Sequence, residues 1–512
     1  IRSFYAGKLI YAANWDDYQD VPFWGALDYI GIDSYFPLSS ATTPSVEELV
    51  KAWQKKISEY GIKSGSVVGL EGDFSPNAIG LLLALIENSC IIVPQNNNNN
   101  KLRKIKDEIA QIEYYFYVDT QDNVRFEKTD RVAEHELFST IRKRNHPSII
   151  LFSSGTSGAP KAAVHDFTYL LEKFKTPRKA LVTINFLLFD HWGGLNTLFH
   201  TLANGGTTVT VHDRSPEIIC QLIEKYKVGL LPATPTFLNL MLISGSYKNY
   251  DLSSLKLITY GAEPMPHGTL TRLHNIFPDI KLQQTYGLIE VGVLHSKSKE
   301  NGSLWVKVGG DGYATRIVDG MLQIKTKSTI LGYLNAPSPI SEDGWFMTGD
   351  VGKIIKKNGV EFLKITDRKK ELFKTSGGKY IAPGNMENKF KESRFIEQIM
   401  VIGEFQRFPA AIIVPAFAFV KDWCELKAIE CKTHEEMISN PQVIARIQQE
   451  IDTFNVGYAN YEKIKKIALV KDEWAIQTGE LTPKLSLKRR NIMVKYRDLV
   501  EKLYAEGERE IA

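Results

Sequence analysis

The feature that most constrains the fold is a regular alternation of strand-like and helix-like segments from about residue 58 onward. Short apolar runs typical of buried strands lie at 66–70, 91–94, 207–211, 229–232, 255–260 and 282–286. Helical patterns lie between them, at 77–87, 216–226 and 267–276. This alternation predicts an α/β fold, with a large domain of parallel sheets flanked by helices. In such a fold, ligands bind at the carboxyl ends of the strands, where the loops gather.

A loop rich in hydroxyls and glycines follows the apolar run at 148–152. It reads SSGTSGAPK and contains Ser153, Ser154, Gly155, Thr156, Ser157, Gly158 and Lys161. Backbone N–H groups and hydroxyls that end in one positive charge suit an anion. The common nucleotide loop needs a serine or threonine directly after its lysine to hold magnesium, and Lys161 is followed by alanine. The loop therefore predicts phosphate binding of another kind, with a polar surface loop as the simpler alternative.

Two further glycine-containing loops also follow predicted strands. They read YGAEP at 260–264 and YGLIE at 286–290. Each alone is a weak signal, because glycine is common after a strand and a lone glutamate is usually just solvated. Three such loops, all at strand ends, favour a shared nucleotide site.

The sequence changes character after about Asp350. A dense charge run at 367–371 is followed by TSGGKY at 375–380, and strand patterns recur at 398–403, 411–414 and 465–470. These patterns predict a smaller α+β C-terminal domain. We expect a large domain over residues 58–369 and this smaller domain over 370–512, with residues 1–57 as a separate fragment of strand–helix units.

Composition excludes several partners. The 63 basic and 59 acidic residues give a net charge of +4, which does not favour nucleic acid. No apolar run approaches the roughly 20 residues of a membrane span, so no transmembrane segment is expected, while peripheral membrane contact and the oligomeric state stay open. The four cysteines include no CxxC pair, which is typical of reduced thiols in a cytoplasmic protein. Cys424 and Cys431 are expected to fill a core from one helix. No signal-peptide pattern opens the chain, and a start at Ile1 instead of methionine indicates processing or a larger parent.

The motifs together resemble a known family. SSGTSGAPK, YGAEP, TYGLIE, FMTGD and DRKKELFKTSGGKYIAP resemble, in this order, the signature segments of the AMP-forming adenylate ligases, and of the acyl-CoA synthetases in particular. The resemblance runs from about residue 58 to the end, and its C-terminal part is similar to bacterial long-chain fatty acyl-CoA synthetases. It implies activation of a carboxylic acid, expected to be a fatty acid, by ATP with Mg²⁺, and transfer of the acyl group to coenzyme A. Two anions must meet in that reaction, so fixed cations and N–H donors lower its barrier.

The resemblance also implies a role for each motif. The loop from Ser153 to Lys161 would bind the β- and γ-phosphates, and Glu290 would hold magnesium. The segments that would surround adenine are Gly261, Ala262, Glu263, Thr285, Tyr286 and Gly287. Asp350 would accept the ribose hydroxyls, and Arg368 would contact the same nucleotide.

The remaining roles concern the acyl group and the thiol. His191 and Trp192 fall where the family has a gate to the acyl pocket, and a satisfied core histidine is an equally good interpretation of His191. Lys370 matches the family's hinge, although it is also one residue of a charged run. Gly377 would line the thiol tunnel.

Two departures from the family pattern bear on activity. The family usually has threonine or serine where this chain has Ile289, and that hydroxyl contacts the α-phosphate. Near the C-terminus, Ser486 occupies the position of the family's adenylation lysine. Lys484 and Lys488 are the candidate substitutes, but in an extended segment each is displaced by about 6–7 Å. We therefore expect weak adenylation, or adenylation by a shifted lysine.

Residues 1–57 resemble a different family. The segment ANW…DYIGIDSYFPL is similar to two strand–helix units of a mannanase-like TIM-barrel glycoside hydrolase. A closed barrel needs eight such units, so a working glycosidase is not expected. The remaining alternatives are a nucleotide- and acyl-binding homologue or chimera with weak or lost catalysis, and acyl transfer to a carrier-protein thiol.

Overall fold

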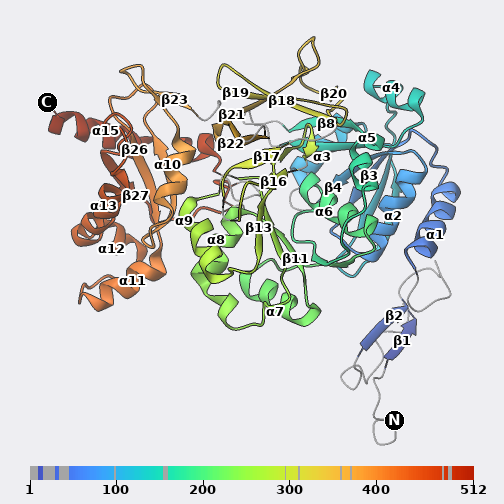
Figure 1. The fold of residues 1–512 in the computed structure, drawn as a ribbon, viewed down its shortest axis with the longest axis horizontal. Helices are drawn as coiled ribbons and strands as arrows, with labels where there is room; N and C mark the ends of the chain where they lie inside the picture. Colours follow the sequence, from blue (N-terminus) through green and yellow to red (C-terminus); the bar gives the residue numbers. More distant parts are fainter. Residues whose placement is uncertain are drawn as a thin grey trace, which may run out of the picture. The chain divides into compact units, whose positions relative to one another are not determined.

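The computed structural model describes residues 10–14, 29–33, 45–96, 100–153, 160–263, 265–294, 296–301, 303–308, 312–357, 360–368, 372–475, 478–481 and 487–511. The chain divides into two compact units. Figure 1 labels their helices and strands along the chain. Unit 1 comprises Ile1–Asp213, Ile289–Gly292 and Ser328–Ser338. Unit 2 comprises Arg214–Leu288, Val293–Lys327 and Pro339–Ala512.

The core of unit 1 is a seven-stranded sheet with the order β20-β8-β7-β4-β3-β5-β6. Its strands are β3 (Val67–Glu71), β4 (Ile91–Gln95), β5 (Tyr114–Val118), β6 (Val124–Lys128), β7 (Ser148–Ser153), β8 (Lys161–Asp166) and β20 (Gly332–Tyr333). The central strands β3, β4, β5 and β7 pair in parallel, and every residue of β3 and β4 is buried. Burial on both faces explains why these strands read as continuous apolar runs. The outer pairings of β6, β8 and β20 are antiparallel, which the alternation of strands and helices did not predict.

Unit 1 also contains two short parallel strand pairs and its helices. The pairs are β1 (Ile10–Asn14) with β2 (Tyr29–Asp33), and β9 (Val182–Ile184) with β10 (Thr207–Val209). The helices are α1 (Val46–Glu59), α2 (Pro76–Glu87), α3 (Asn100–Ala110), α4 (Glu136–Arg144), α5 (Phe167–Leu171), the 3-10 helix η3 (Glu172–Lys175) and α6 (Trp192–Ala203).

Helix α1 packs into unit 1 through one apolar face. A capping box formed by Ser45 and Glu48 fixes its start. Trp53 is 3% exposed, and its indole Nε1 donates to Asn77 Oδ1 of α2 at 3.1 Å. The predicted boundary between residues 57 and 58 therefore falls inside a helix whose buried face belongs to this core.

The first part of unit 2 repeats the parallel α/β pattern. The parallel strands are β11 (Leu230–Ala233), β12 (Leu257–Tyr260) and β13 (Lys281–Gln284). The helices are α7 (Pro216–Tyr226), α8 (Pro235–Ser244), the 3-10 helix η4 (Ser246–Lys248) and α9 (His267–Ile276). The bounds of α7 and α9 match the sequence-based expectation.

An antiparallel sheet follows in unit 2, in the order β16-β17-β22-β21-β19-β18. Its strands are β16 (Ser296–Ser298), β17 (Val306–Val308), β18 (Tyr313–Val318), β19 (Met321–Thr326), β21 (Phe346–Lys357) and β22 (Val360–Arg368), with the short strands β14 (Gly287–Leu288) and β15 (Gly292–Val293) before them. This sheet positions Asp350 and Arg368.

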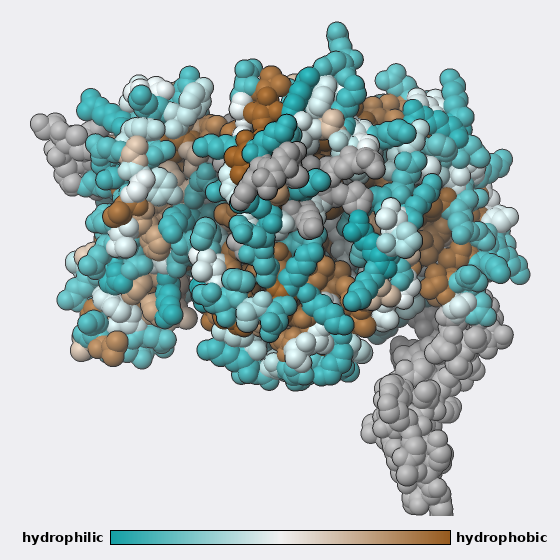
Figure 2. Space-filling model, viewed as in Figure 1, coloured by the Kyte–Doolittle hydropathy of each residue, from teal (hydrophilic) through white to brown (hydrophobic). Residues whose placement is uncertain are grey.

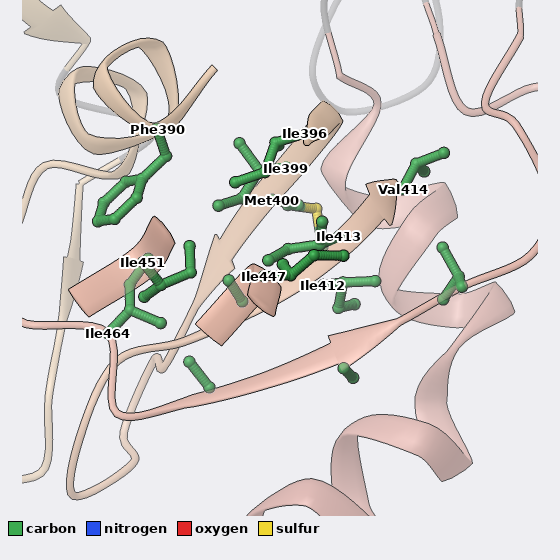
Figure 3. Close-up of a cluster of buried hydrophobic side chains, with 14 of the residues drawn as sticks. Phe390, Ile396, Ile399, Met400, Ile412, Ile413, Val414, Ile447, Ile451 and Ile464 are labelled. Carbon is green, nitrogen blue, oxygen red and sulfur yellow. The ribbon is translucent and has the colours of Figure 1, made fainter. Parts of the chain in front are cut away.

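The C-terminal part of unit 2 has its own α+β core. A three-stranded sheet of β25 (Ile396–Ile402), β26 (Ala410–Pro415) and β27 (Lys466–Leu469) carries branched aliphatic side chains that pack against helices (Figure 3). The other elements are β23 (Phe373–Lys374), β24 (Tyr380–Ile381), α10 (Pro383–Phe390), α11 (Phe417–Leu426), α12 (His434–Ser439), α13 (Pro441–Asn455), α14 (Arg489–Lys495) and α15 (Arg497–Ile511). The fold is thus an α/β large domain with a smaller C-terminal domain, as predicted.

One local expectation was wrong. Cys424 and Cys431 are both buried, but α11 ends at Leu426, so they do not share a helix. The backbone turns at Ala428, whose φ of 55° lies in the left-handed region and cannot continue a helix.

Within the part of the chain that the structure describes, no helix combines the length and the apolar character needed to cross a bilayer.

Candidate functional site

The predicted phosphate loop joins two neighbouring antiparallel strands of unit 1. Ser153 ends β7, Lys161 begins β8, and the two residues lie directly opposite each other in the ladder. The amide of Asn335 donates to Pro160 O at 2.8 Å, and its Oδ1 accepts from Ala162 N at 3.1 Å. The returning end of the loop is therefore held by a residue far along the chain. Ser154, Gly155, Thr156, Ser157 and Gly158 lie outside the described residues.

Lys161 and Glu290 both contact one tyrosine, Tyr333, in unit 1. The hydroxyl of Tyr333 donates to Glu290 Oε1 at 2.6 Å. Lys161 Nζ lies 5.4 Å from the centroid of the Tyr333 ring. Burial and the Glu290 carboxylate both raise the pKa of Tyr333, so its hydroxyl stays protonated and donates. The structure thus brings the predicted phosphate lysine and the predicted metal carboxylate to one residue that sequence reasoning missed.

The segment that carries Glu290 is fixed through its backbone. His165 Nε2 lies 2.7 Å from Ile289 O, and Ile330 N donates to Glu290 O at 2.9 Å. Burial lowers the pKa of His165 to about 4, so the ring is neutral at pH 7 and donates its Nε2–H to that carbonyl. Ile289 therefore has a well-defined backbone, but its side chain offers no hydroxyl.

The predicted magnesium ligand suits the chemistry of that ion. Mg²⁺ commonly binds one or two carboxylates, with waters and substrate phosphates completing its shell. Glu290 supplies one carboxylate, held by Tyr333, beside a lysine that would attract phosphate. Over the described residues there is no cluster of three or more His, Cys, Asp or Glu that could hold a metal. The donor set therefore fits a magnesium ion that arrives with a triphosphate.

In unit 2 the two predicted adenine segments are joined at the ends of β12 and β13. Thr285 N donates to Tyr260 O at 2.8 Å, and Thr285 Oγ1 donates to the same oxygen at 3.1 Å. A Cβ on Gly261 would lie 2.3 Å from Thr285 Oγ1, so only glycine fits. Ala262 follows with a φ of 69°. The YGAEP loop is thus shaped by contact with the threonine of TYGLIE.

The glutamate of the same loop is held by the start of α8. Glu263 Oε2 accepts from Thr236 Oγ1 at 2.5 Å and from Thr236 N at 3.2 Å. This contact at a helix N-terminus orients the carboxylate. Thr236 is a second residue that sequence reasoning missed.

The predicted adenine and ribose residues also meet within unit 2. The Tyr286 hydroxyl donates to Asp350 Oδ2 at 2.6 Å, and both side chains are buried. Asp350 of β21 lies opposite Arg368 of β22 in the antiparallel register. Gly287, which follows Tyr286, begins β14. Three of the predicted nucleotide residues are thus brought together across more than 60 residues of chain.

The predicted acyl-gate residues lie at the start of α6 in unit 1. His191 Nδ1 lies 3.1 Å from Asp190 Oδ1, and Lys106 Nζ lies 3.8 Å from the other oxygen of that carboxylate. Burial opposes ionisation of Asp190, but His191 and Lys106 outweigh it and lower its pKa. Trp192 is 3% exposed and packs edge-on against Phe167. The choice between a gate and a core histidine at His191 stays open on these contacts.

Gly377 lies in an exposed turn of the C-terminal domain. A Cβ at this position would meet Thr375 Oγ1 at 3.9 Å and nothing closer, so local packing does not require glycine. This space is compatible with a ligand passing close to the backbone. Lys370, the predicted hinge, lies outside the described residues.

The segment with the candidate adenylation lysines is fixed at its two ends. Leu481 bridges to Leu487, and Lys488 N donates to Glu480 O at 2.7 Å. Glu480 in turn accepts from Lys495 Nζ at 2.8 Å. Lys488 directly precedes α14 as its N-cap residue. Lys484 and Ser486 lie between these ends, outside the described residues.

Sequence reasoning missed Tyr333, Asn335 and His165 because nothing local marks them. Asn335 and Pro160 are 175 positions apart, and Tyr333 and Glu290 are 43 apart. Only the sheet register of β20 on β8 brings these residues to the loop.

Two family models match the chain. The AMP-binding enzyme model matches residues 62–320, just over half of the chain. The chain belongs to the AMP-binding enzyme family. The model of the AMP-binding enzyme C-terminal domain matches residues 371–508 of this AMP-binding enzyme.

Its curated relatives are acyl-CoA synthetases. Long chain acyl-CoA synthetase 2 of Arabidopsis thaliana is 28% identical over 280 residues, which is 50% of this chain and 42% of the relative. Long-chain-fatty-acid–CoA ligase 1 of Homo sapiens is 34% identical over 194 residues, 36% of this chain and 27% of the relative. Acyl-CoA synthetase 7 of Caenorhabditis elegans is 26% identical over 389 residues, 69% of this chain and 67% of the relative. The chain thus spans less than half the length of the first two relatives.

Solved structures share the fold at low identity. The adenylation domain of a carboxylate reductase from Mycobacterium chelonae superposes with a TM-score of 0.70 at 17% identity, covering 90% of this chain and 84% of that one. ATP-bound MatB from Rhodopseudomonas palustris superposes with a TM-score of 0.65 at 19% identity, covering 88% of this chain and 93% of that one. These likenesses support the fold alone.

Proposed function

We propose that this AMP-binding enzyme activates a fatty acid with ATP and Mg²⁺ to an acyl-adenylate, and transfers the acyl group to the thiol of coenzyme A. The observation that carries the proposal is the arrangement of Lys161, Tyr333 and Glu290 at the base of the hydroxyl-rich loop. Lys161 and a magnesium ion bound by Glu290 would offset the negative charge of a triphosphate under attack by a carboxylate. The names of the curated relatives agree with the acyl substrate.

Within this proposal each predicted residue has a task. Ser153 to Gly158 and Lys161 bind the β- and γ-phosphates, and Glu290 binds magnesium. Asp350 and Arg368 bind the ribose, beside an adenine stacked on Tyr286. We place the acyl entrance at His191 and Trp192, and the thiol path at Gly377.

A direct test measures pyrophosphate release with palmitate, ATP and magnesium. Tyr333→Phe removes the hydrogen bond to Glu290 without changing the ring beside Lys161. We expect it to raise the magnesium concentration needed for half-maximal exchange between ATP and pyrophosphate. Tyr226→Phe, at an exposed tyrosine, is the matched control. An unchanged magnesium dependence in Tyr333→Phe would separate Tyr333 from the metal site.

A second candidate function is nucleotide and acyl binding without efficient turnover. It is favoured by the apolar side chain of Ile289 and by Ser486 at the adenylation-lysine position. ATP binding without pyrophosphate release would support it. Comparing acyl-adenylate formation by Ser486→Lys with that of the parent tests whether Lys484 or Lys488 already acts as the adenylation lysine. No gain in Ser486→Lys would mean that one of these two lysines already has that role.

We further propose a lid domain over residues 370–512 that turns about Lys370 between the two half-reactions, on the family pattern. We also propose that residues 1–57 have a separate origin and derive from a mannanase-like glycoside hydrolase. The parallel pairing of β1 and β2 supports this proposal. We also propose a role in lipid metabolism, which the proposed substrate supports, and a cytoplasmic location, which the four cysteines without a CxxC pair favour. Comparing coenzyme A with a carrier protein as acceptor tests which thiol is used.

A further inference from the structure

An apolar hollow opens on unit 1, where α1, α2 and α6 meet the end of α5. Its volume is about 400 Å³, and its lining is Val46, Leu83, Leu171, Phe174, Phe199, Leu202 and Ala203. None of these side chains can hydrogen-bond. The volume lies in the range of about 300–1,000 Å³ that small-molecule sites occupy.

Several apolar side chains that line the hollow are exposed to solvent. Val46 is 46% exposed at the first turn of α1, and Leu83 is only half-buried. Figure 2 shows apolar surface on this unit, over α2 and beside α1. Exposed apolar surface gathered in a concavity is typical of a binding site. An occupant with a hydrocarbon part would remove this surface from water.

A basic group borders the hollow along α6. Lys173 lies between two lining residues in sequence, and its Nζ is 5.2 Å from the centroid of the Phe174 ring. The same ammonium donates to Asn196 Oδ1 of α6 at 2.6 Å. Asn196 lies three residues before Phe199, so it occupies the lining face of that helix.

Two further basic residues lie close to Lys173. His200 follows Asn196 by four residues, so it lies one turn further along the same face. The backbone N–H of Arg178 donates to Asn204, the residue that ends α6. Burial, then Arg178 and Lys173, lower the pKa of His200, and burial and Arg178 lower the pKa of Lys173 to about 7. The protonated forms of these groups repel one another, so a carboxylate beside Lys173 would raise its pKa and form an ion pair with it.

We propose that this hollow binds a fatty-acid anion, with its hydrocarbon chain against the apolar lining and its carboxylate at Lys173, Arg178 and His200. A basic group that can be protonated, next to an apolar floor, complements an amphipathic anion, whereas a nucleotide base would find no hydrogen-bonding partner on the floor. The site goes beyond the activation reaction and does not depend on it.

The hollow is a second acyl site, apart from the entrance proposed at His191 and Trp192. Neither of those residues contributes to its lining. Fully buried Phe167 packs edge-on against both Trp192 and Phe199, with ring centroids 6.0 Å and 5.4 Å away. Trp192 and Phe199 lie seven residues apart on α6, and only Phe199 lines the hollow.

The test uses the full chain and a laurate analogue that carries a photoreactive diazirine, with cross-links assigned to residues by mass spectrometry. We expect labels on 171–174 and 199–203, displaced by laurate and not by its uncharged methyl ester. Affinity should rise by about fourfold for each added methylene from octanoate upward until the hollow is full.

Two variants and one control sharpen the result. Ala203→Trp fills the hollow and should abolish labelling. Lys173→Met keeps the stem, removes the charge and should weaken laurate binding by about tenfold. Lys248→Met is the matched control, because Lys248 also lies over an aromatic ring, at 5.9 Å from the Tyr247 centroid. A thermal unfolding scan of each variant reports whether it is folded.

Several outcomes would overturn the proposal. They are labels confined to 183–192, equal displacement by the methyl ester, full labelling of a folded Ala203→Trp, or unchanged laurate affinity in Lys173→Met. If the hollow stays unlabelled and the chain dimerises as its concentration rises, the hollow is instead a contact surface for a second copy of the chain.

Discussion

At the scale of single residues, the site is held by contacts that its motifs do not announce. The hydroxyl of Tyr333 donates a hydrogen bond to Glu290, and the amide of Asn335 holds the returning end of the predicted phosphate loop. Ile289 is the residue of this segment that departs from the family pattern. His165 donates to the carbonyl of Ile289 at 2.7 Å and so fixes the backbone of the residue that stands where the family usually has a hydroxyl.

Ile289→Thr should therefore increase adenylation. Gaining one hydrogen bond to a charged phosphate is worth about 1.5–3 kcal/mol, which corresponds to roughly a ten- to hundred-fold faster step if it is felt fully in the transition state. Exchange of labelled pyrophosphate into ATP with palmitate measures the change. Ile289→Val, which alters shape without adding a hydroxyl, is the control, and an equal gain in both variants would rule out the hydrogen bond as the cause.

At the scale of elements, two pieces outside the obvious motifs support the site. Helix α1 covers α2 through Trp53, and the ion pair of Glu480 with Lys495 anchors the segment that carries the candidate lysines. Both contacts join segments whose association could not be predicted from their helix or strand propensity.

Trp53→Ala should destabilise unit 1. Removing a buried tryptophan costs about 3–5 kcal/mol, and Asn77 also loses its indole donor. Urea unfolding followed by circular dichroism measures the free energy. Lys51→Ala, at an exposed position of the same helix, should change it by less than about 0.5 kcal/mol. A Trp53→Ala protein as stable as the parent would mean that α1 does not belong to this core.

The Glu480–Lys495 pair should stabilise the C-terminal domain in a pH-dependent way. Burial alone raises the pKa of Glu480, but hydrogen bonds from Lys495 and Thr478 outweigh it and lower the pKa from 4.5 to about 2. A carboxylate whose pKa is lower in the folded state stabilises that state above its unfolded pKa, and this stabilisation is lost as the pH falls toward 2.

Glu480→Gln should accordingly reduce the free energy of unfolding by about 2–3 kcal/mol at pH 7 and by less than half as much at pH 3. Urea titrations of parent and variant at the two pH values give the difference. Glu435→Gln, which removes an exposed ion pair with Lys471, provides the control. A pH-independent effect of Glu480→Gln would point to packing instead of charge.

At the scale of the whole molecule, the sequence predicts the class of fold well and the connections within it poorly. The periodic segments of α7 and α9 carry enough local signal for their bounds to be predicted. Strand β8 was missed because its first residue belongs to the phosphate motif and its partners are set by register. The antiparallel sheet from β16 to β22 was missed because its pairings are long-range, and tertiary contacts decide them.

The same limit applies to the site. Its glycines, lysine and acidic residues were proposed because their motifs resemble those of a known family, whereas Tyr333, Asn335 and Thr236 were found only in the folded structure. Hydrogen bonds between residues far apart in sequence leave no periodic trace.

Gly377→Leu should separate the two half-reactions. The turn has room for a side chain, so we expect unchanged stability and unchanged exchange of pyrophosphate into ATP. Acyl-CoA formation should fall by at least about tenfold, because the side chain would occupy the proposed thiol path. Ser376→Ala, in the same turn, is the control for a change of side chain that adds no bulk. Gly61→Leu is not suitable as a control, because Gly61 has a φ of 71° and any side chain there would strain the backbone. Equal loss of both half-reactions would argue against a thiol path at Gly377.

The two hydrogen bonds of Asn335 also set an order of events during synthesis. Pro160 and its partner are 175 positions apart, so the closing contact of the phosphate loop cannot form until the ribosome has released Asn335. At about 5–20 residues per second, that interval lasts roughly 10–35 s. Throughout it, the nascent polypeptide carries the proposed phosphate-binding segment without the contact that holds its returning end.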